Sequence, residues 1–233
     1  GLSFDQPVEA IESIAIGTLN ILEVIRLLSK PVRFYNAGSS ECFGDTGDTP
    51  ANEQTPFAPR SPYAVAKSTA KWLINSYRES YGLYACTGIL FNHESPLRPE
   101  RFVTQKIIAG AAKIKAGQLD KLQLGNLDIS RDWGWAPEYV EAMWLMMQLD
   151  KPDDFVIATG RKESLKYFVA KSFEYFDLDW QKYVEIEKSF FRPNEIVSSV
   201  GNPEKAIKTL GWKKPTDIDG VIKMMCAEKA KSI

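Results

Sequence analysis

The sequence has few cysteines, a single histidine and no long apolar run, and these absences exclude several classes of protein. The three cysteines, Cys42, Cys86 and Cys226, are scattered and odd in number. Neither a disulfide framework nor a metal site is therefore expected, and a reducing cytoplasm is the expected location. No apolar stretch approaches the roughly 20 residues that span a bilayer. The N-terminal residues have neither the basic start nor the apolar core of a signal peptide.

An excess of one charge is also missing, as is a glycine-rich turn. The 29 Lys and Arg residues balance 30 Asp and Glu residues, which argues against a nucleic-acid-binding face and against a polybasic membrane anchor. The 15 glycines form neither a GxGxxG nor a GxxGxxG run, the pattern that brings backbone amides to a dinucleotide pyrophosphate. What remains, 233 residues with 44% apolar and 25% charged side chains, is typical of one soluble domain, or of a domain with a smaller lobe.

Apolar patterns alternate between strands and helices along the chain. We expect strands at 32–35, 85–91, 122–124 and 155–158, and helices at 11–28, 62–81, 102–116, 137–149, 164–176, 202–210 and 217–229. This alternation predicts an α/β fold with a mostly parallel sheet. Ligands of such folds bind at the carboxyl ends of the strands.

Three helix ends carry capping signals. Ser61 followed by Pro62 predicts an N-cap and a proline in the first turn. Gly82 predicts the C-cap of the same helix. Thr216 with Asp219 predicts a capping box at the start of the last helix.

Chemistry-bearing side chains follow the first strand and begin the helix after it. Tyr63 and Lys67 are four residues apart, so they share one helix face. Lowering the pKa of a tyrosine from about 10 to 7 needs about 4 kcal/mol, much of which a nearby ammonium can supply. Ser39, at a strand end, could share a substrate oxygen with Tyr63. Taken singly, these residues also fit a solvent-facing helix pair and a turn after a strand.

With Ser39, Tyr63 and Lys67 the sequence resembles the extended short-chain dehydrogenases/reductases, which carry a Ser/Thr…Tyr-x-x-x-Lys triad on a Rossmann fold. The resemblance becomes closer in six blocks, which are similar to the GDP-mannose 4,6-dehydratase family from about Ser3 to Glu228. These blocks are AGSSE at 37–41, PRSPY at 59–63, ILFNHESP at 89–96, LGNLD at 124–128, RDWG at 131–134 and FRP at 191–193.

The resemblance implies a Rossmann-like parallel sheet with a smaller α/β substrate-binding lobe. Residues 1–91 would be the second half of the NADP-binding domain with its catalytic residues. Residues 92–233 would be mainly the nucleotide-sugar-binding lobe, with 130–160 returning to the Rossmann domain. The family's first strand and glycine-rich turn are missing, so the chain is expected to be a fragment, the partner of a separate N-terminal piece, an incomplete chain or a natural short form. We expect the chain alone to bind NADP weakly, and tight binding in a fluorescence titration would overturn this.

The resemblance also implies a hydro-lyase that dehydrates GDP-mannose to GDP-4-dehydro-6-deoxy-D-mannose, the first step towards GDP-fucose or other GDP-deoxyhexoses. Tyr63 would take the proton of the C4 hydroxyl, with its pKa lowered by Lys67, and Ser39 would bind the C4 oxygen in place of the family's usual threonine. Glu41 would take the C5 proton; alone, it also fits a solvated carboxylate at a loop start. Two alternatives remain open: another extended short-chain reductase or epimerase on a nucleotide sugar, which needs no such base, and a catalytically inactive binding or scaffold fragment.

Binding residues follow from the same blocks. On the NADP side the resemblance implies Tyr63, Lys67, Leu90, His93 and Arg98. On the GDP-mannose side it implies Asn92, Lys106, Leu124, Gly125, Asn126, Arg131, Arg192 and Glu195. It further implies a homodimer or homotetramer with no nucleic-acid or membrane partner. The sugar pocket or the subunit contacts are expected to differ from the family's, because the sequence departs from the family pattern at Gln105, Trp135, Pro137 and 161–163.

Overall fold

Three parallel strands, in the order β1-β2-β7, form the main sheet of the computed structural model, which describes residues 2–28, 30–191, 194–213 and 215–231. The strands are β1 (Arg33–Ala37), β2 (Tyr84–Leu90) and β7 (Phe155–Ile157). Every residue of β2 after the first is buried, as expected for a strand covered on both faces. The predicted parallel sheet is confirmed, with strand ends shifted by one or two residues.

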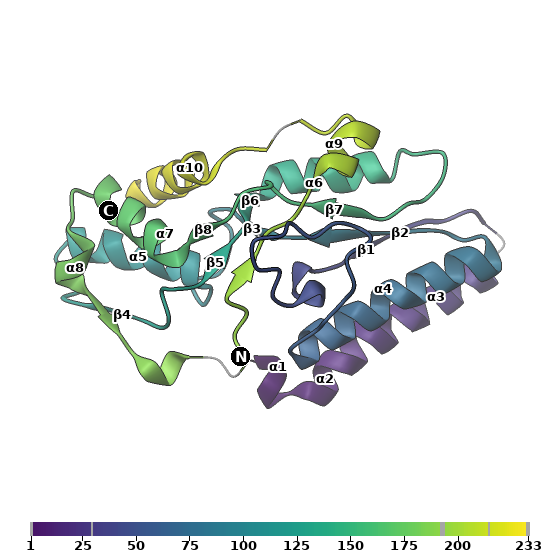
Figure 1. Cartoon of the computed structure of the whole chain (residues 1–233), viewed down its shortest axis with the longest axis horizontal. Helices are drawn as coiled ribbons and strands as arrows, with labels where there is room; N and C mark the ends of the chain where they lie inside the picture. The colour runs from purple at the N-terminus through teal and green to yellow at the C-terminus, as the bar shows by residue number, and fades with distance from the viewer. Residues whose placement is uncertain (1, 29, 192–193, 214, 232–233) are drawn as a thin grey trace.

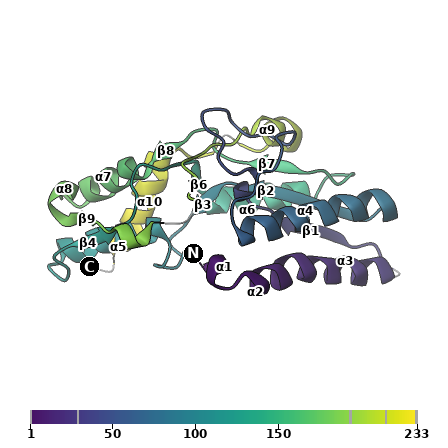
Figure 2. The same ribbon diagram turned by 60° about the horizontal axis from the view of Figure 1, so that its bottom comes forward.

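Helices cover both faces of this sheet. On one face lie α4 (Pro62–Tyr81) and an N-terminal helical segment, made of α1 (Leu2–Asp5), α2 (Pro7–Ile11), a π-helical turn (Glu12–Ile16) and α3 (Gly17–Leu27). Figure 2 shows this segment running alongside α4. Leu22, Ile74 and Ala85 pack together where α3, α4 and β2 meet. The helix predicted from residue 11 therefore begins earlier and contains a π turn.

The opposite face is covered by α6 (Ala136–Met146) and α9 (Glu204–Leu210), which lie above β7 in Figure 1. Tyr139, Met146 and Trp212 are buried there against Cys86 and Phe155 of the sheet. The result is a three-layer α/β arrangement around the sheet.

A second core lies at the other end of the molecule, on the left in Figure 1. It is built by α5 (Val103–Lys115), α7 (Leu165–Tyr175) and α10 (Ile218–Ala230), with α8 (Trp180–Tyr183) at the edge. Short strands complete it: β3 (Asn92–Glu94) with β6 (Trp133–Trp135), β4 (Leu122–Leu124) with β9 (Val184–Ile186), and β10 (Ser198–Ser199), β5 (Ser130–Arg131) and β8 (Glu163–Ser164) together. Of these only β4 was predicted, because two or three residues are too few to set a pattern.

The capping predictions divide. Ser61 caps α4 by accepting a 3.1 Å hydrogen bond from the Ala64 amide, and Gly82 ends the helix with a φ of 65°. At α10 the prediction was wrong, because Asp217 is the cap and accepts from the Gly220 amide at 2.9 Å. Thr216 is not free to cap, since its hydroxyl donates to the Glu138 carboxylate at 2.5 Å.

The buried carboxylate of Asp132 joins the two ends of the molecule. It accepts hydrogen bonds from the amide and hydroxyl of Thr159 and from the amides of Gly160 and Gly201. These partners follow β7 and β10, so one side chain fixes where both segments leave their strands. In the part of the chain that the structure describes, no helix combines the length and the apolar character needed to cross a membrane.

Candidate active site

Four of the predicted site residues meet where β1 ends and α4 begins. Ser39 and Glu41 follow β1, in and beside a 3₁₀ turn (Ser40–Phe43) that Ser39 caps by accepting from the Glu41 amide at 3.3 Å. Tyr63 and Lys67 lie on the first two turns of α4. The carboxyl end of a parallel strand thus faces the amino end of the following long helix, the usual ligand position in an α/β fold.

Tyr63, like Ser39, Glu41 and Lys67, is half-buried. Burial raises the pKa of its phenol, while a hydrogen bond with the side chain of Ser39 acts in the opposite direction. The Lys67 ammonium lies 5.7 Å from the centre of the Tyr63 ring and donates to the Ala37 carbonyl at 2.9 Å. Burial also lowers the pKa of Lys67. Ionising the phenol near neutral pH therefore requires further positive charge in the site.

Glu41 is held by a residue that was predicted only as a helix cap. The Ser61 hydroxyl donates to Glu41 Oε2 at 3.3 Å while its oxygen accepts from the Ala64 amide. Ser61 therefore ties the carboxylate after β1 to the helix that carries Tyr63. The position of Ser61, two residues before Tyr63, was the only hint in the sequence that it belongs to the site. The sequence does not show that a capping serine also binds a second side chain.

The end of β2 and the segment after it carry four more predicted site residues: Leu90, Asn92, His93 and Arg98. Leu90 is buried at the end of β2, and Asn92 is half-buried at the start of β3. His93 Nδ1 lies 2.8 Å from the Phe91 carbonyl oxygen, and burial lowers the pKa of its imidazole, which favours the neutral ring. Arg98 donates from Nη1 to the His93 carbonyl at 2.8 Å. The charge of Arg98 reaches Tyr63 and favours its ionised form.

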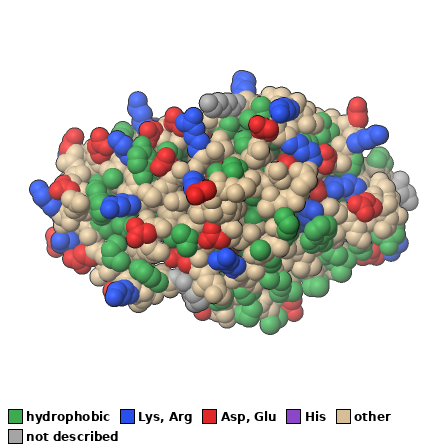
Figure 3. All heavy atoms as spheres, in the orientation of Figure 1, with side chains coloured by type: hydrophobic (Ala, Val, Ile, Leu, Met, Phe, Trp, Pro, Cys, Tyr) green, Lys and Arg blue, Asp and Glu red, His purple; other side chains and the backbone are tan. Residues whose placement is uncertain are grey.

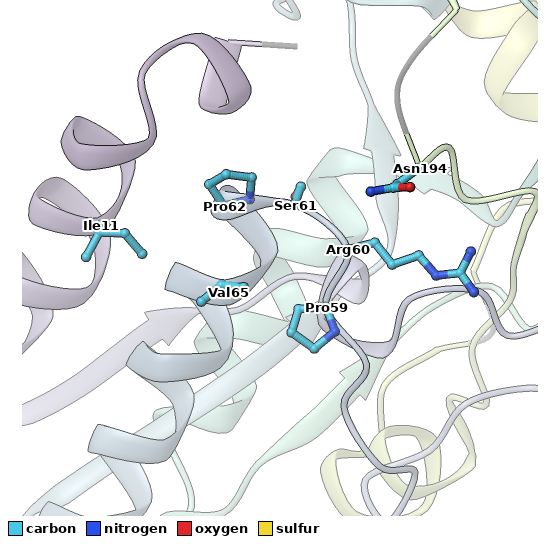
Figure 4. Close-up of a pocket in the computed structure, with 7 residues that line it drawn as sticks. All are labelled: Ile11, Pro59, Arg60, Ser61, Pro62, Val65 and Asn194. Carbon is cyan, nitrogen blue, oxygen red and sulfur yellow. The ribbon is translucent and has the colours of Figure 1, made fainter.

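An open hollow of about 670 Å³ lies at the amino end of α4, beside the four catalytic candidates but not lined by them. Its lining comprises Ile11, Pro59, Arg60, Ser61, Pro62, Val65 and Asn194. In Figure 4 Ile11 lies on one side, whereas Arg60 and Asn194 lie together on the other. The hollow brings Ser61, the partner of Glu41, to the same opening as the segment that contains Glu195.

The residues predicted to bind the nucleotide sugar form another group around 187–195. Asn126 donates to Glu195 Oε2 at 3.3 Å, and the Leu124 carbonyl accepts from the Glu187 amide at 2.7 Å. The Lys106 ammonium lies 4.5 Å from the centre of the Phe190 ring, and an added Cβ at Gly125 would meet Phe190 at 3.3 Å.

Two arginines complete this part of the prediction. Arg131 donates to the carbonyls of Ser130 and Val197, at 2.9 and 3.5 Å, so its guanidinium lies against the start of the 197–201 segment. Arg192 was also predicted and lies outside the described residues. Ser61 and Asn194 line the same hollow, so the group around Tyr63 and the group around Glu195 open towards the same part of the surface.

Comparison with known proteins identifies the family. The family model described as GDP-mannose 4,6 dehydratase matches residues 1–225. The chain belongs to the GDP-mannose 4,6-dehydratase family. It is 49% identical over 231 residues to GDP-mannose 4,6 dehydratase 1 of Arabidopsis thaliana, covering 97% of this chain and 64% of that protein. It is 44% identical to the Dictyostelium discoideum GDP-mannose 4,6 dehydratase, covering 100% and 70%. The chain thus spans slightly less than two thirds of the length of the Arabidopsis relative.

Solved structures confirm the Rossmann-like α/β fold expected for the family. The structure of RMD from Pseudomonas aeruginosa complexed with NADPH is similar with a TM-score of 0.89 at 20% identity, over 99% of this chain and 77% of that one. The dTDP-glucose 4,6-dehydratase of Bacillus anthracis in complex with NAD gives a TM-score of 0.85 at 18% identity, over 97% and 70%. At these identities the likeness concerns the fold.

Proposed function

We propose that this chain carries the catalytic residues of an NADP-dependent GDP-mannose 4,6-dehydratase, a hydro-lyase that forms GDP-4-dehydro-6-deoxy-D-mannose. The observation that carries the proposal is the position of the Glu41 carboxylate, joined through Ser61 to the helix of Tyr63 and Lys67. An oxidoreductase triad alone needs no additional carboxylate, whereas elimination of water across C5–C6 needs a base for C5. Family membership over residues 1–225 supports the same reaction, the first step towards GDP-fucose or other GDP-deoxyhexoses.

The donor set around Tyr63 fits an anionic dinucleotide. Lys67 and Arg98 are cations, and the lowered pKa of His93 favours a neutral ring whose Nδ1–H donates to the Phe91 carbonyl, which leaves Nε2 as an acceptor. Together with Leu90 and Tyr63 these residues would hold NADP on this chain. When bound there, NADP would supply the acceptor for the hydride of sugar C4 and the donor of the hydride to C6.

The protein's own groups would move the protons. Tyr63 takes the proton of the C4 hydroxyl, and Ser39 donates a hydrogen bond to the same oxygen. A C4 ketone makes the C5 proton acidic, so Glu41 can remove it as the C6 hydroxyl leaves. Transfer of that proton from Glu41 to the departing hydroxyl yields the released water. When hydride reaches C6, a proton must be added at C5, and the proton that Tyr63 took from the C4 hydroxyl balances this addition. The Ser61 hydroxyl keeps the Glu41 carboxylate oriented for both roles.

The nucleotide end would lie against the group around Glu195. We assign the GDP-mannose contacts to Asn92, Lys106, Leu124, Gly125, Asn126, Arg131, Arg192 and Glu195. The bond between Asn126 and Glu195 supports this, because it brings a carboxylate suited to sugar hydroxyls beside a strand-end loop. Arginine forks match the paired oxygens of a pyrophosphate. We also propose that residues 1–91 belong to the cofactor-binding domain and residues 92–233 mainly to the sugar-nucleotide-binding lobe. Residues 130–160 would return to the cofactor-binding domain.

We also propose a homodimer or homotetramer in the cytoplasm. Large apolar side chains are exposed on the N-terminal helical segment and α4, among them Ile21, Val24 and Trp72. Figure 3 shows apolar side chains gathered at the lower right, where Figure 1 places α3 and α4. Contiguous exposed apolar surface is typical of a contact between subunits. Sedimentation velocity tests the assembly, and a monomer at all concentrations would contradict it.

The three cysteines are buried and unpaired, which suits the proposed location in a reducing compartment.

Product formation tests the proposed reaction. The full-length gene product that contains this chain, incubated with GDP-mannose and NADP+, should form a 4-keto-6-deoxy product detectable by mass spectrometry. Glu41→Gln should lower kcat by about 10²–10⁴-fold, the usual size of a lost general base. Glu79→Gln, an exposed position on the same helix α4, is the matched control and should keep the activity. Full activity of the Glu41→Gln variant would contradict the assignment.

A further inference from the structure

A buried ion pair lies behind the candidate active site, and the proposed reaction does not use its carboxylate. Glu94, the last residue of β3, is 1% exposed. Its Oε2 accepts a 2.7 Å hydrogen bond from the Thr104 hydroxyl and lies 3.3 Å from Arg98 Nε. A carboxylate at this depth is costly unless it is paired and hydrogen-bonded. The burial of the Glu94 carboxylate therefore calls for a specific role of this side chain.

Arg98 is fixed at three points by one short stretch of chain. Nε lies 3.3 Å from the Glu94 carboxylate in an ion pair that is not a hydrogen bond, Nη1 donates to the His93 carbonyl at 2.8 Å, and the guanidinium lies 4.0 Å from the centre of the Phe102 ring. These partners all lie between the end of β3 and the start of α5. The guanidinium is planar, so any rotation would break its contact with Glu94, with the His93 carbonyl or with the Phe102 ring.

The fixed guanidinium matters because it acts on the catalytic cluster. The positive charge of Arg98 favours the ionised form of Tyr63 and disfavours protonation of His93. His93 is itself held, stacked on Tyr139 with ring centres 4.9 Å apart. Cations placed in advance stabilise developing negative charge more effectively than cations that must reorganise.

We propose that Glu94 and Thr104 are positioning residues that hold the guanidinium of Arg98 in place for the negative charge at the active site. That charge is the Tyr63 phenolate or the phosphate of a bound dinucleotide, and the proposal rests on the function proposed above for Tyr63 and Arg98. Neither Glu94 nor Thr104 contacts the substrate in this role. Both act through Arg98, with Thr104 orienting the carboxylate and Glu94 orienting the guanidinium.

NMR of the arginine side chain tests the positioning without any need for activity. In protein labelled with ¹⁵N-arginine, the Nε–H signal of Arg98 is assigned by its loss in Arg98→Lys. Glu94→Gln keeps the side-chain size but removes the charge that pairs with the guanidinium, so it should speed solvent exchange of this proton by about tenfold or more, because a broken buried ion pair no longer holds the side chain in place. Thr104→Val, which keeps the shape, should speed it by a smaller factor.

Glu100→Gln is the matched control, because Glu100 lies on the same loop and pairs with Lys113 and Lys229 at the surface. It should leave the Arg98 signal unchanged. Exchange that stays at the unmodified rate in both Glu94→Gln and Thr104→Val would overturn the proposal. Thr104→Val keeps the test decisive even where Glu94→Gln fails to fold.

A double-mutant cycle tests the consequence for the reaction. In the active full-length protein, Glu94→Gln should lower kcat by about tenfold with little change in KM for GDP-mannose, as expected for a weakened transition-state interaction. In an Arg98→Met background, Glu94→Gln should have no further effect on kcat, because it acts only through Arg98. Independent, multiplicative losses would contradict the positioning role. An unmodified protein without dehydratase activity would contradict the proposed function, and the exchange rates alone would then decide the role of Glu94.

Discussion

At the scale of single residues, the site depends on small hydroxyl groups that each serve two partners. The Ser39 oxygen accepts from the Glu41 amide, and the same side chain hydrogen-bonds Tyr63. This contact opposes the rise that burial produces in the Tyr63 pKa. A hydroxyl at position 39 is therefore needed for the proposed chemistry, and a methyl group beside it is not expected to matter.

The prediction at Ser39 follows from that contact. Ser39→Thr should keep kcat within about threefold, because the hydroxyl is retained, whereas Ser39→Ala should lower kcat by about 10–100-fold. Initial rates of 4-keto-6-deoxy product formation give the comparison. Equal losses in the two variants would mean that packing, and not the hydroxyl, is what position 39 contributes.

Burial of Glu94 predicts a pH dependence of stability. Burial raises the pKa of Glu94 from 4.5 to about 7, with Arg98 and Thr104 acting in the opposite direction. The folded state therefore binds this proton more tightly than the unfolded chain does. The resulting stabilisation is complete below pH 4.5 and is lost as the pH rises through 7.

Urea unfolding of the wild type and of Glu94→Gln isolates this effect from other titrating groups. The free energy of unfolding of the wild type, relative to that of Glu94→Gln, should fall by on the order of 1–3 kcal/mol between pH 4.5 and 8. Glu100→Gln serves as the control, since Lys229 and Lys113 lower the pKa of Glu100 and its titration should end at a lower pH. A relative stability of the wild type that rises over this range would contradict the burial argument.

The sequence predicts site residues whose relation is local, and it does not reveal those whose partners lie far away in the chain. Tyr63 and Lys67 were predicted because helical spacing alone puts them on one face. Glu94 and Asp132 were not given a role, because the role of each depends on partners that only tertiary structure brings close. Asp132 is an example, since its donors stand 27 to 69 residues further along the chain.

At the scale of elements, α4 links the fold to the chemistry. Its first two turns carry Tyr63 and Lys67, and its cap residue Ser61 binds Glu41. Loss of the Ser61 hydroxyl should therefore affect both the stability of the helix and the orientation of the carboxylate.

A pair of cap variants separates these two effects. Ser61→Ala and Ser164→Ala each remove a cap, at α4 and at α7, and each should lower the free energy of unfolding by about 1 kcal/mol. Only Ser61→Ala should also lower kcat, because Ser164 has no partner in the candidate site among the contacts that the structure describes. Chemical denaturation and initial rates measure the two quantities. Equal activity of the two variants would show that Ser61 only caps the helix.

Element prediction succeeded where patterns were long. The helix 62–81 was predicted with its bounds and both caps, because Ser61, Pro62 and Gly82 mark its ends locally. The last helix was given the wrong cap, because the hydroxyl of Thr216 is taken by Glu138, which is 78 residues away. Strands such as β5 and β10 have two residues each, and their existence depends on pairing with distant segments.

At the scale of the whole molecule, polar contacts link the two hydrophobic cores. One core lies around the sheet and the other around α5, α7 and α10. The loop after the 3₁₀ turn binds the segment that carries β10: the Thr46 amide donates to the Ser198 carbonyl at 3.0 Å, and the Ala51 amide to the Val200 carbonyl at 2.9 Å. Asp132 adds its hydrogen bonds to the same region. The catalytic cluster and the group around Glu195 are thereby held at a common surface, as the proposed reaction on a nucleotide sugar would require.

Isotope tracing tests the central claim, that this chain supplies the residues for an internal oxidation, elimination and reduction of GDP-mannose. The full-length protein would be given GDP-mannose deuterated at C4, with NADP+, and the product examined by NMR. The account predicts a 4-keto-6-deoxy sugar with the deuterium at C6, because the hydride removed from C4 is returned in the same active site. Deuterium retained in the reduced cofactor, with no 6-deoxy product, would indicate a simple dehydrogenase and would contradict the account.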